Sequence, residues 1–174
     1  FAVRNDLPPI YADGCHQETE RTSPLRCDYG NRDAHFLVAL VGGSHAAHWL
    51  PTLEIIAERE DWRIVTFTKS SCLLSAGPQF HHDGRSYPEC EEWNDKVMSE
   101  LLKLKPDLVF TTSTTAQTEP ESLPSGVLKA WGRLEQEGLG VVAIRDVPWM
   151  GFDVSECVDR EGSDSPDCTR RRDE

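Results

Sequence analysis

Four apolar runs of strand length alternate with segments of helical periodicity, and this order constrains the fold more than any other feature. The apolar runs cover residues 35–41, 62–68, 107–111 and 139–145. The first is continuous, which is typical of a strand buried on both faces. Apolar positions recur at helical spacing from Ala46 onward, over 91–105 and over 124–137. This alternation predicts a parallel sheet covered by helices on both faces.

The chain of 174 residues is expected to form one domain, covering 35–174, behind a polar N-terminal arm, 1–34, that lacks periodicity. In a parallel α/β sheet, working residues lie in the loops beyond the carboxyl ends of the strands. The predicted ends are polar or small, at residues 42–45, 68–72, 111–115 and 146–149. We therefore expect any site at this edge of the sheet.

Charge and hydropathy argue against two properties, nucleic acid binding and a membrane-spanning segment. The chain has 18 Lys plus Arg against 30 Asp plus Glu, a formal charge of −12, and its basic residues are scattered. Such a surface offers no counter-charge to a nucleic acid backbone. No apolar run approaches the roughly 20 residues that span a bilayer. The chain begins at Phe1 without a signal peptide, so we expect a mature fragment or an excised domain.

Six cysteines form three pairs that are local in sequence. Each pair brackets a polar segment rich in turn-forming residues, which favours three disulfides that close surface loops. The favoured pairings are Cys15–Cys27, Cys72–Cys90 and Cys157–Cys168. Reduced core thiols and a metal site are the alternatives, although no pair has the CxxC spacing of a zinc site. Disulfides would place the domain in an oxidising compartment.

The turn Gly42-Gly43-Ser44-His45 carries the best candidate for chemistry. A serine between a buried strand and a helix projects its hydroxyl above the sheet edge, where backbone N–H groups can stabilise an oxyanion. That geometry suits a nucleophile. The alternative is an ordinary helix N-cap, in which Ser44 satisfies a free backbone donor without any catalytic role. The turn lacks both glycine patterns of nucleotide-binding loops.

The same turn resembles the first block of the SGNH (GDSL-type) hydrolase family, in the version fused behind bacterial acyltransferase-three membrane proteins. That block usually reads Gly-Asp-Ser-His, followed by small residues, Trp and Pro. The matching residues of the block are Gly42, Ser44, His45, Ala46, Trp49 and Pro51. Further matches are Tyr11-Ala-Asp-Gly-Cys15, Thr-Lys-Ser-x-Cys72, Cys90-x-x-Trp93, Pro106-Asp-Leu-Val109, Arg145-Asp-Val-Pro148 and Cys157. Their order and spacing extend the resemblance over nearly the whole chain.

The resemblance implies a three-layer α/β/α fold with a parallel sheet, in which Ser44 is the nucleophile. It implies an extracytoplasmic domain tethered by a preceding membrane acyltransferase domain of the same polypeptide. The membrane domain would supply an acyl group, most simply acetyl, and the SGNH domain would pass it to a cell-envelope carbohydrate or glycolipid. No cofactor and no metal are expected. A non-catalytic carbohydrate-binding or partner-docking domain on the same fold is the alternative.

Two departures from the family pattern bear on activity. The usual Asp of the turn is Gly43, and no Asp-x-x-His follows Ser44, although the family carries its catalytic pair in that motif after a further strand. We therefore expect that the C-terminal strand and catalytic segment are missing from this chain and that the fragment alone is nearly inactive. Asp13-x-x-His16 has the right spacing but precedes the nucleophile, so it is taken as a chance match.

Several weaker candidates surround the expected pocket. The candidate oxyanion and pocket residues are Gly43, His45, Ser71, Thr112, Ser113 and Trp149. Solvated loop hydroxyls are the alternative interpretation for the serines and threonines. His81 and His82 lack a carboxylate or thiol partner at ligand spacing, which argues against metal. The tryptophans Trp49, Trp93 and Trp131 lie on apolar helix faces and are expected in the core.

Overall fold

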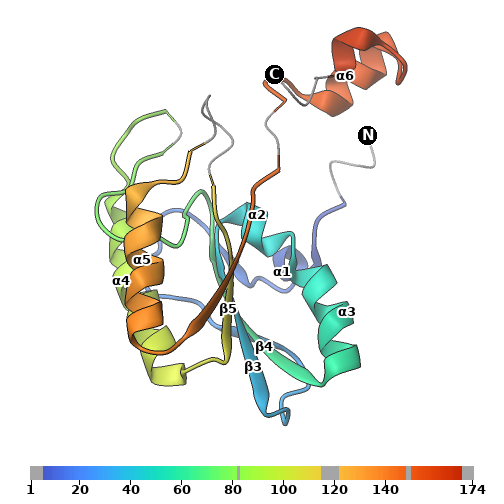
Figure 1. Cartoon of the computed structure of the whole chain (residues 1–174). Coiled ribbons are helices and arrows are strands. Elements are labelled where there is room, and N and C mark those ends of the chain that lie inside the picture. The colour runs from blue at the N-terminus through green and yellow to red at the C-terminus, as the bar shows by residue number, and fades with distance from the viewer. Residues whose placement is uncertain (1–5, 82, 115–121, 148–149, 170–174) are drawn as a thin grey trace.

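A six-stranded sheet forms the middle layer of the molecule (Figure 1). The computed structural model describes residues 6–81, 83–114, 122–147 and 150–169. The strands are β1 His16–Gln17, β2 Cys27–Gly30, β3 Phe36–Gly42, β4 Trp62–Lys69, β5 Leu108–Thr112 and β6 Gly140–Ile144. Their order is β1-β4-β3-β5-β6, with all neighbours parallel, and β2 runs antiparallel along β4. The four predicted strands are thus confirmed, each within one residue at either end.

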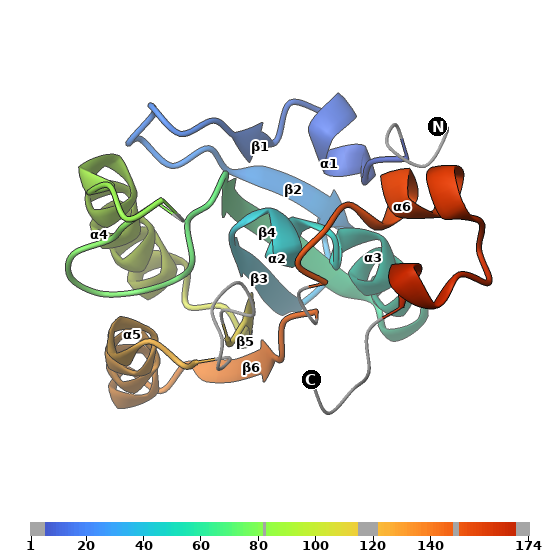
Figure 2. The same ribbon diagram turned by 90° about the horizontal axis from the view of Figure 1, so that it is seen from above.

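Helices cover both faces of this sheet. They are α1 Pro9–Ala12, α2 Ser44–Ala47, α3 Leu50–Glu60, α4 Pro88–Leu104, α5 Ser125–Gln136, α6 Val154–Glu161 and a 3-10 helix Pro166–Cys168. Helices α4 and α5 lie on one face, and α1, α2 and α3 lie on the other (Figure 2). The predicted three-layer α/β/α architecture is confirmed.

Burial on both faces explains the apolar run of β3. Val38 and Leu40 pack with the buried side chains of α2 and α3, whereas Ala39 and Val41 pack with those of α4 and α5. All four side chains are fully buried. A strand that alternates between two cores has no polar face, so its sequence reads as continuous. The two cores fix the position of β3 in the middle of the sheet.

The helix predicted from Ala46 is divided in two. Helix α2 ends at Ala47, and α3 begins at Leu50, with Pro51 in its first turn. Proline has no N–H to donate, and the first turn of a helix is where that loss costs nothing. The break leaves α2 as a single turn that carries Ser44 at its start.

The N-terminal arm contributes to the sheet, which its sequence did not predict. Ile10 of α1 is fully buried, β1 pairs with the last residues of β4, and β2 pairs with residues 63–66 of the same strand. The C-terminal segment contains α6 and the 3-10 helix, neither of which the sequence analysis predicted. Within the described parts of the chain, no helix has the length and apolar character needed to cross a bilayer.

The three disulfides pair as the sequence predicts. They join Cys15 to Cys27, Cys72 to Cys90, and Cys157 to Cys168. The first joins two parts of the N-terminal arm, the residue before β1 and the start of β2, and the second joins the loop after β4 to α4. The third ties α6 to the 3-10 helix, beyond the main body of the molecule (Figure 1).

Candidate active site

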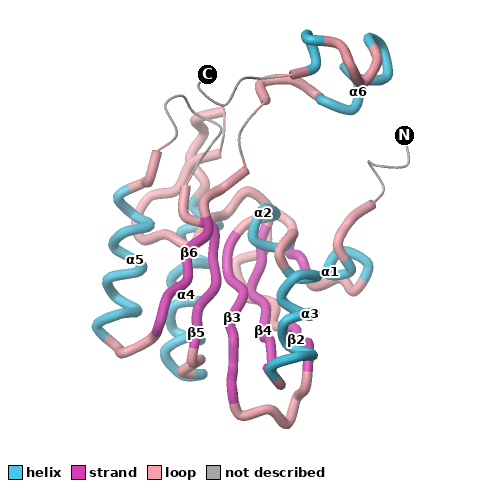
Figure 3. The backbone as a smooth tube through the Cα atoms, turned by 45° about the vertical axis from the view of Figure 1, so that its right-hand side comes forward, coloured by secondary structure: helices cyan, strands magenta, loops and turns pink. Residues whose placement is uncertain are grey.

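The turn after β3 places Ser44 at the carboxyl edge of the sheet, where α2 begins (Figure 3). Gly42 has a φ of +140°, and a Cβ there would lie 3.0 Å from the Cβ of Ala46. Residues other than glycine rarely adopt this backbone conformation, and the close approach of α2 leaves no room for a Cβ. The sharp turn into α2 therefore depends on glycine at position 42.

Gly43 is different, because its φ of −82° is open to any residue. A Cβ at this position would meet the backbone of Cys72 at 3.5–3.8 Å, which is ordinary van der Waals contact. The loop after β4 therefore packs directly on the turn. The backbone here could carry the Asp of the family pattern, so Gly43 changes the side chain without a change of turn geometry.

Ser44 does not act as a helix cap. It is the first residue of α2, whereas the N-cap residue is Gly43, and no side-chain capping bond is formed there. Its backbone carbonyl accepts a hydrogen bond from the N–H of His48 at 3.0 Å, and the side chain is half-buried. The alternative interpretation as a structural cap therefore does not describe this serine.

Two buried threonines at the end of β5 face the turn. A Cβ on Gly42 would lie 3.5 Å from the Thr111 hydroxyl and 3.9 Å from the Thr112 hydroxyl. The Thr111 hydroxyl donates to the carbonyl of Thr112 at 3.4 Å. The Thr112 hydroxyl is buried and has no hydrogen-bond partner within the described ranges. Of the hydroxyls predicted for the pocket, Thr112 is thus the one that is buried without a hydrogen-bond partner in the described structure.

Ser113 and Ser71 are less suited to that role. The Ser113 hydroxyl donates to the carbonyl of Ile144 at 3.1 Å, and its N–H donates to the same atom, so β6 already uses both donors. Ser71 has a left-handed φ of 53° and an exposed side chain. It precedes Cys72, whose backbone lies against Gly43, and no contact of Ser71 itself with the turn is seen in the described structure. Trp149 lies outside the described residues.

His45 pairs with an aspartate that the sequence analysis did not single out. Its Nδ1 lies 2.6 Å from Oδ1 of Asp146, which follows β6. The same Oδ1 accepts the N–H of Val147 at 2.8 Å, and the Asp146 N–H donates to the Thr114 hydroxyl at 3.2 Å. The Asp146 side chain is 7% exposed and that of His45 is 37% exposed. This pair bridges the ends of β3 and β6 across β5.

A second histidine, His16, lies in β1, so it is on the opposite side of the central strand β3 from Asp146. Its Nδ1 lies 3.0 Å from the Thr68 hydroxyl, and its Nε2 lies 3.3 Å from the Ser70 hydroxyl. Burial, with a smaller contribution from nearby His48, lowers the pKa of His16 to about 4. An imidazole with such a pKa is neutral at physiological pH and a weak base.

Asp13 does not partner this histidine. Its carboxylate accepts a hydrogen bond from the Tyr29 hydroxyl at 3.0 Å. Asp13-x-x-His16 therefore forms no carboxylate–imidazole pair in the described structure, in keeping with its interpretation as a chance match.

The other predicted candidates lie elsewhere. His81 stacks on Tyr87 with ring centroids 4.0 Å apart, and His82 lies outside the described residues. Trp93 of α4 is fully buried in the hydrophobic core, and Trp49 and Trp131 are partly buried. Among the residues that the structure describes, no three His, Cys, Asp or Glu side chains gather as a metal site would require.

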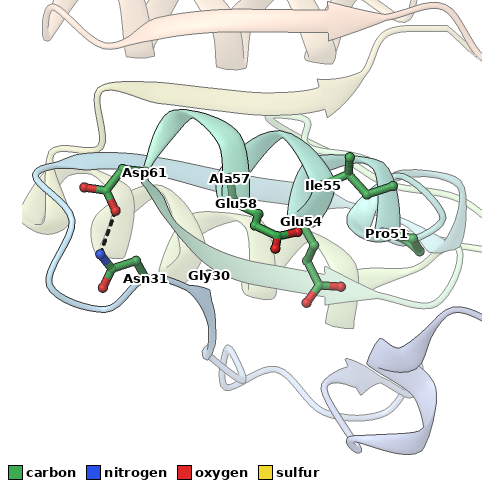
Figure 4. Close-up of a pocket in the computed structure, with 8 residues that line it drawn as sticks. All are labelled: Gly30, Asn31, Pro51, Glu54, Ile55, Ala57, Glu58 and Asp61. Atoms are coloured by element: carbon green, nitrogen blue, oxygen red, sulfur yellow. Dashed lines mark hydrogen bonds between the residues drawn. The ribbon is translucent and has the colours of Figure 1, made fainter.

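A groove of about 660 Å³ runs along α3 beside the end of β2 (Figure 4), and Ser44 is not among the residues that line it. It is lined by Gly30, Asn31, Pro51, Glu54, Ile55, Ala57, Glu58 and Asp61. Burial, with a smaller contribution from Asp13, raises the pKa of Glu54. None of the residues predicted for the site lines this groove, and of its carboxylates Glu58 and Asp61 are exposed whereas Glu54 is partly buried.

Comparison with known families decides the relationship of the chain. Residues 14–174 match the model of the family described as "SGNH domain (fused to AT3 domains)". The chain belongs to this family. The SGNH domain described here matches no curated protein.

A solved structure shares the fold of this SGNH domain. It is the periplasmic domain of the lipopolysaccharide acetyltransferase of Salmonella ser. Paratyphi A, with a TM-score of 0.59 and 14% sequence identity. The superposed region covers 78% of the present chain and 55% of the Salmonella chain. The likeness confirms the expected SGNH-like fold class.

Proposed function

We propose that this SGNH domain accepts an acyl group, most simply acetyl, on Ser44 and passes it to a hydroxyl of a cell-envelope carbohydrate or glycolipid. The observation that carries the proposal is the position of Ser44. Ser44 does not act as the helix cap, and it is half-buried. A turn that requires Gly42 holds it at the carboxyl edge of the sheet. A serine hydroxyl so placed can attack an acyl carbonyl and form an ester.

The oxyanion of the tetrahedral intermediate needs donors beside Ser44. The first N–H groups of α2 have no intrahelical acceptor, and the Thr112 hydroxyl is buried close to Gly42 without a partner in the described chain. We assign the oxyanion to these groups. Thr112 then takes the position after the third predicted strand at which family members carry an Asn.

Ser44 also needs a proton acceptor. Neighbouring residues of a helix point about 100° apart, so His45 is poorly placed to take the Ser44 proton. His16 is engaged with Thr68 and Ser70 and is weakly basic. By the family resemblance, the base is the histidine of an Asp-x-x-His motif, and no such motif follows Ser44 within these 174 residues. We therefore propose that residues 1–174 alone are nearly inactive.

The family description and the cysteines support the proposed setting. Members of the family are fused to AT3 domains, which suggests a membrane acyltransferase domain in the same polypeptide as the source of the acyl group. All six cysteines form disulfides, which persist in oxidising compartments. Both features fit an extracytoplasmic domain tethered to the plasma membrane.

The test compares two serine variants of the full-length protein. Ser44→Ala should abolish hydrolysis and transfer of acetyl from 4-nitrophenyl acetate, because the attacking hydroxyl is lost. Ser99→Ala, a matched change at an exposed serine of α4, should keep wild-type rates. Circular dichroism checks that both variants fold. Equal rates for wild type and a folded Ser44→Ala would overturn the enzyme proposal and favour the carbohydrate-binding or docking alternative.

A further inference from the structure

We propose that Ser70, oriented by His16, accepts a hydrogen bond from the hydroxyl of the carbohydrate that receives the acyl group from Ser44. This inference rests on the proposed function and gives it a binding site for the acceptor, the acceptor subsite, formed by Tyr11, His16, His48 and Ser70. In this subsite Ser70 positions the acceptor and takes no part in proton transfer.

The hydrogen bonds around the end of β4 run in one direction. The Thr68 hydroxyl donates to the carbonyl of Cys15 at 3.3 Å, so its oxygen accepts the Nδ1 proton of His16 at 3.0 Å. Burial lowers the pKa of His16 to about 4, so the imidazole is neutral and has a single N–H. Nε2 therefore accepts the proton of the Ser70 hydroxyl, whose oxygen lies 3.3 Å away. The Ser70 oxygen keeps its lone pairs and has no proton left to donate.

An oxygen that only accepts hydrogen bonds selects its ligand. A sugar hydroxyl has a proton to donate, whereas an oxyanion, a carboxylate or an ionised phosphate oxygen has none. Ser70 thus suits the attacking hydroxyl of the acceptor and does not suit the oxyanion, which we assign to the first N–H groups of α2 and to Thr112. The Ser70 side chain is partly exposed, so a ligand can reach it.

The register of the strands places Ser70 beside the Ser44 turn. Thr68 of β4 pairs with Gly42 of the neighbouring strand β3. Ser70 and Ser44 each follow this pair by two residues, at the carboxyl edge of the sheet. The chain after Ser70 packs on the turn through the backbone of Cys72. A hydroxyl bound at Ser70 is therefore held next to the strand end that carries the acyl group.

Helix α2 turns the same side toward the N-terminal arm. His48 follows Ser44 by four residues, and its N–H donates to the Ser44 carbonyl, so both side chains lie on one face of the helix. The exposed His48 meets the Tyr11 ring edge-on, with centroids 6.3 Å apart, and the Tyr11 ring lies 4.8 Å from that of His16. Helix α1, which carries Tyr11, lies beside α2 (Figure 3). The acceptor subsite thus extends from Ser44 to Ser70.

The charge of the acceptor subsite favours a neutral sugar. Burial lowers the pKa of both His16 and His48, so both imidazoles are neutral at physiological pH. Lys69 is fully buried, and its ammonium donates to three backbone carbonyls of the arm. Glu18 is acidic and, after burial, contributes to the raised pKa of Tyr11. These groups offer no accessible positive charge to a phosphate or carboxylate, so we expect the acceptor to be a neutral glycosyl hydroxyl.

The experiment compares acyl transfer with hydrolysis in the full-length protein. With 4-nitrophenyl acetate as donor, the burst of nitrophenolate measures acylation of Ser44, and methyl glycosides of glucose, galactose and mannose compete with water for the acyl group. In Ser70→Ala the hydrogen-bond acceptor is lost, so the KM for the methyl glycoside should rise about 3–10-fold. The burst and the hydrolysis rate should stay those of the wild type.

Two further variants separate the positioning role from a structural one. His16→Phe keeps a ring against Tyr11 but releases the proton of Ser70, so the KM for the glycoside should rise while the burst is unchanged. A merely structural role of His16 would not give this split. Ser99→Ala, at an exposed serine of α4, should keep the wild-type KM and burst. Circular dichroism checks that each variant folds.

The neutral character of the acceptor is tested with the 1-phosphates of the same three sugars, which should receive far less acyl group than the methyl glycosides. A wild-type KM in Ser70→Ala and His16→Phe would overturn the subsite. So would preferred transfer to the sugar phosphates, or no transfer to any neutral glycoside by a wild type that shows the burst. Failure of the proposed function would look different, because the wild type would then show no burst that depends on Ser44, and the role of Ser70 would fall with it.

Discussion

Thr112 keeps a hydroxyl that is buried at 2% exposure without a hydrogen-bond partner in the described chain. A buried polar group left unpaired costs about 1–3 kcal/mol of stability. An unpaired donor beside a candidate nucleophile turn has a physical use, because it is ready for an oxygen that becomes negative only during the reaction.

Thr112→Val tests this use. The substitution removes the hydroxyl with little change of shape, so we expect a free energy of unfolding that is unchanged or raised. Acyl transfer should fall by about 10²-fold if the hydroxyl stabilises the oxyanion. Urea denaturation and the nitrophenyl acetate assay measure the two effects.

Thr66→Val is the matched control for that substitution. Thr66 is also fully buried with an unpartnered hydroxyl, but it lies within β4, short of the strand end. It should affect stability in the same direction and leave acyl transfer unchanged. Equal activity in Thr112→Val and Thr66→Val would contradict the assignment of the oxyanion to Thr112.

The sequence predicts the place of Ser44 but not the partners around it. A strand, a glycine turn and a helix are local patterns, so the turn can be found from residues 35–57 alone. The His45–Asp146 pair spans 101 positions and depends on how β3 and β6 are placed across β5. The sequence signals for Asp146 were its position directly after the last predicted strand and its place in the Arg145-Asp-Val-Pro148 match. The hydrogen bond that the Ser113 hydroxyl donates could likewise not be predicted, because its acceptor is the Ile144 carbonyl of β6.

The well-predicted elements are those whose pattern reflects burial. β3 and α4 each bury many apolar side chains, so their sequences carry the period of the element. β2 is a four-residue strand, Cys-Asp-Tyr-Gly, with no fully buried side chain. It exists because β4 offers an unpaired edge, and this long-range pairing leaves no local pattern to read.

The disulfides should differ in effect despite their similar loop lengths. Cys72–Cys90 and Cys157–Cys168 close separations of 18 and 11 residues, for which chain entropy alone predicts about 3 kcal/mol each. Cys72 belongs to the core and its backbone contacts Gly43, whereas Cys157 is the one buried residue of α6.

Alanine at both Cys72 and Cys90 should therefore lower the free energy of unfolding by about 3 kcal/mol and reduce acyl transfer. Alanine at both Cys157 and Cys168 should leave the main unfolding transition and the activity nearly unchanged, because the loss is confined to α6 and the 3-10 helix. Urea denaturation and the esterase assay measure both. Equal effects of the two pairs would contradict the peripheral position of α6.

At the scale of the whole molecule, the strand order gathers the site at one edge. The central strand β3 carries Ser44, its neighbours β4 and β5 bring Cys72 and Thr112 against the turn, and the outer strand β6 brings Asp146. Alternation of strands and helices predicts the layers, because a parallel crossover requires a helix on one face. It does not predict the antiparallel β2, which needs no crossover.

The central claim is that Ser44 carries the acyl group, and mapping of the acyl adduct tests it most directly. The full-length protein and the 174-residue chain are treated with 4-nitrophenyl acetate, quenched in acid, digested and sequenced by mass spectrometry. We predict an acetyl group on the Ser44 peptide of the full-length protein and very little on the 174-residue chain, in line with the low activity proposed for that chain alone. Acetyl on another residue, such as Ser70 beside His16, with Ser44 unmodified, would contradict the claim.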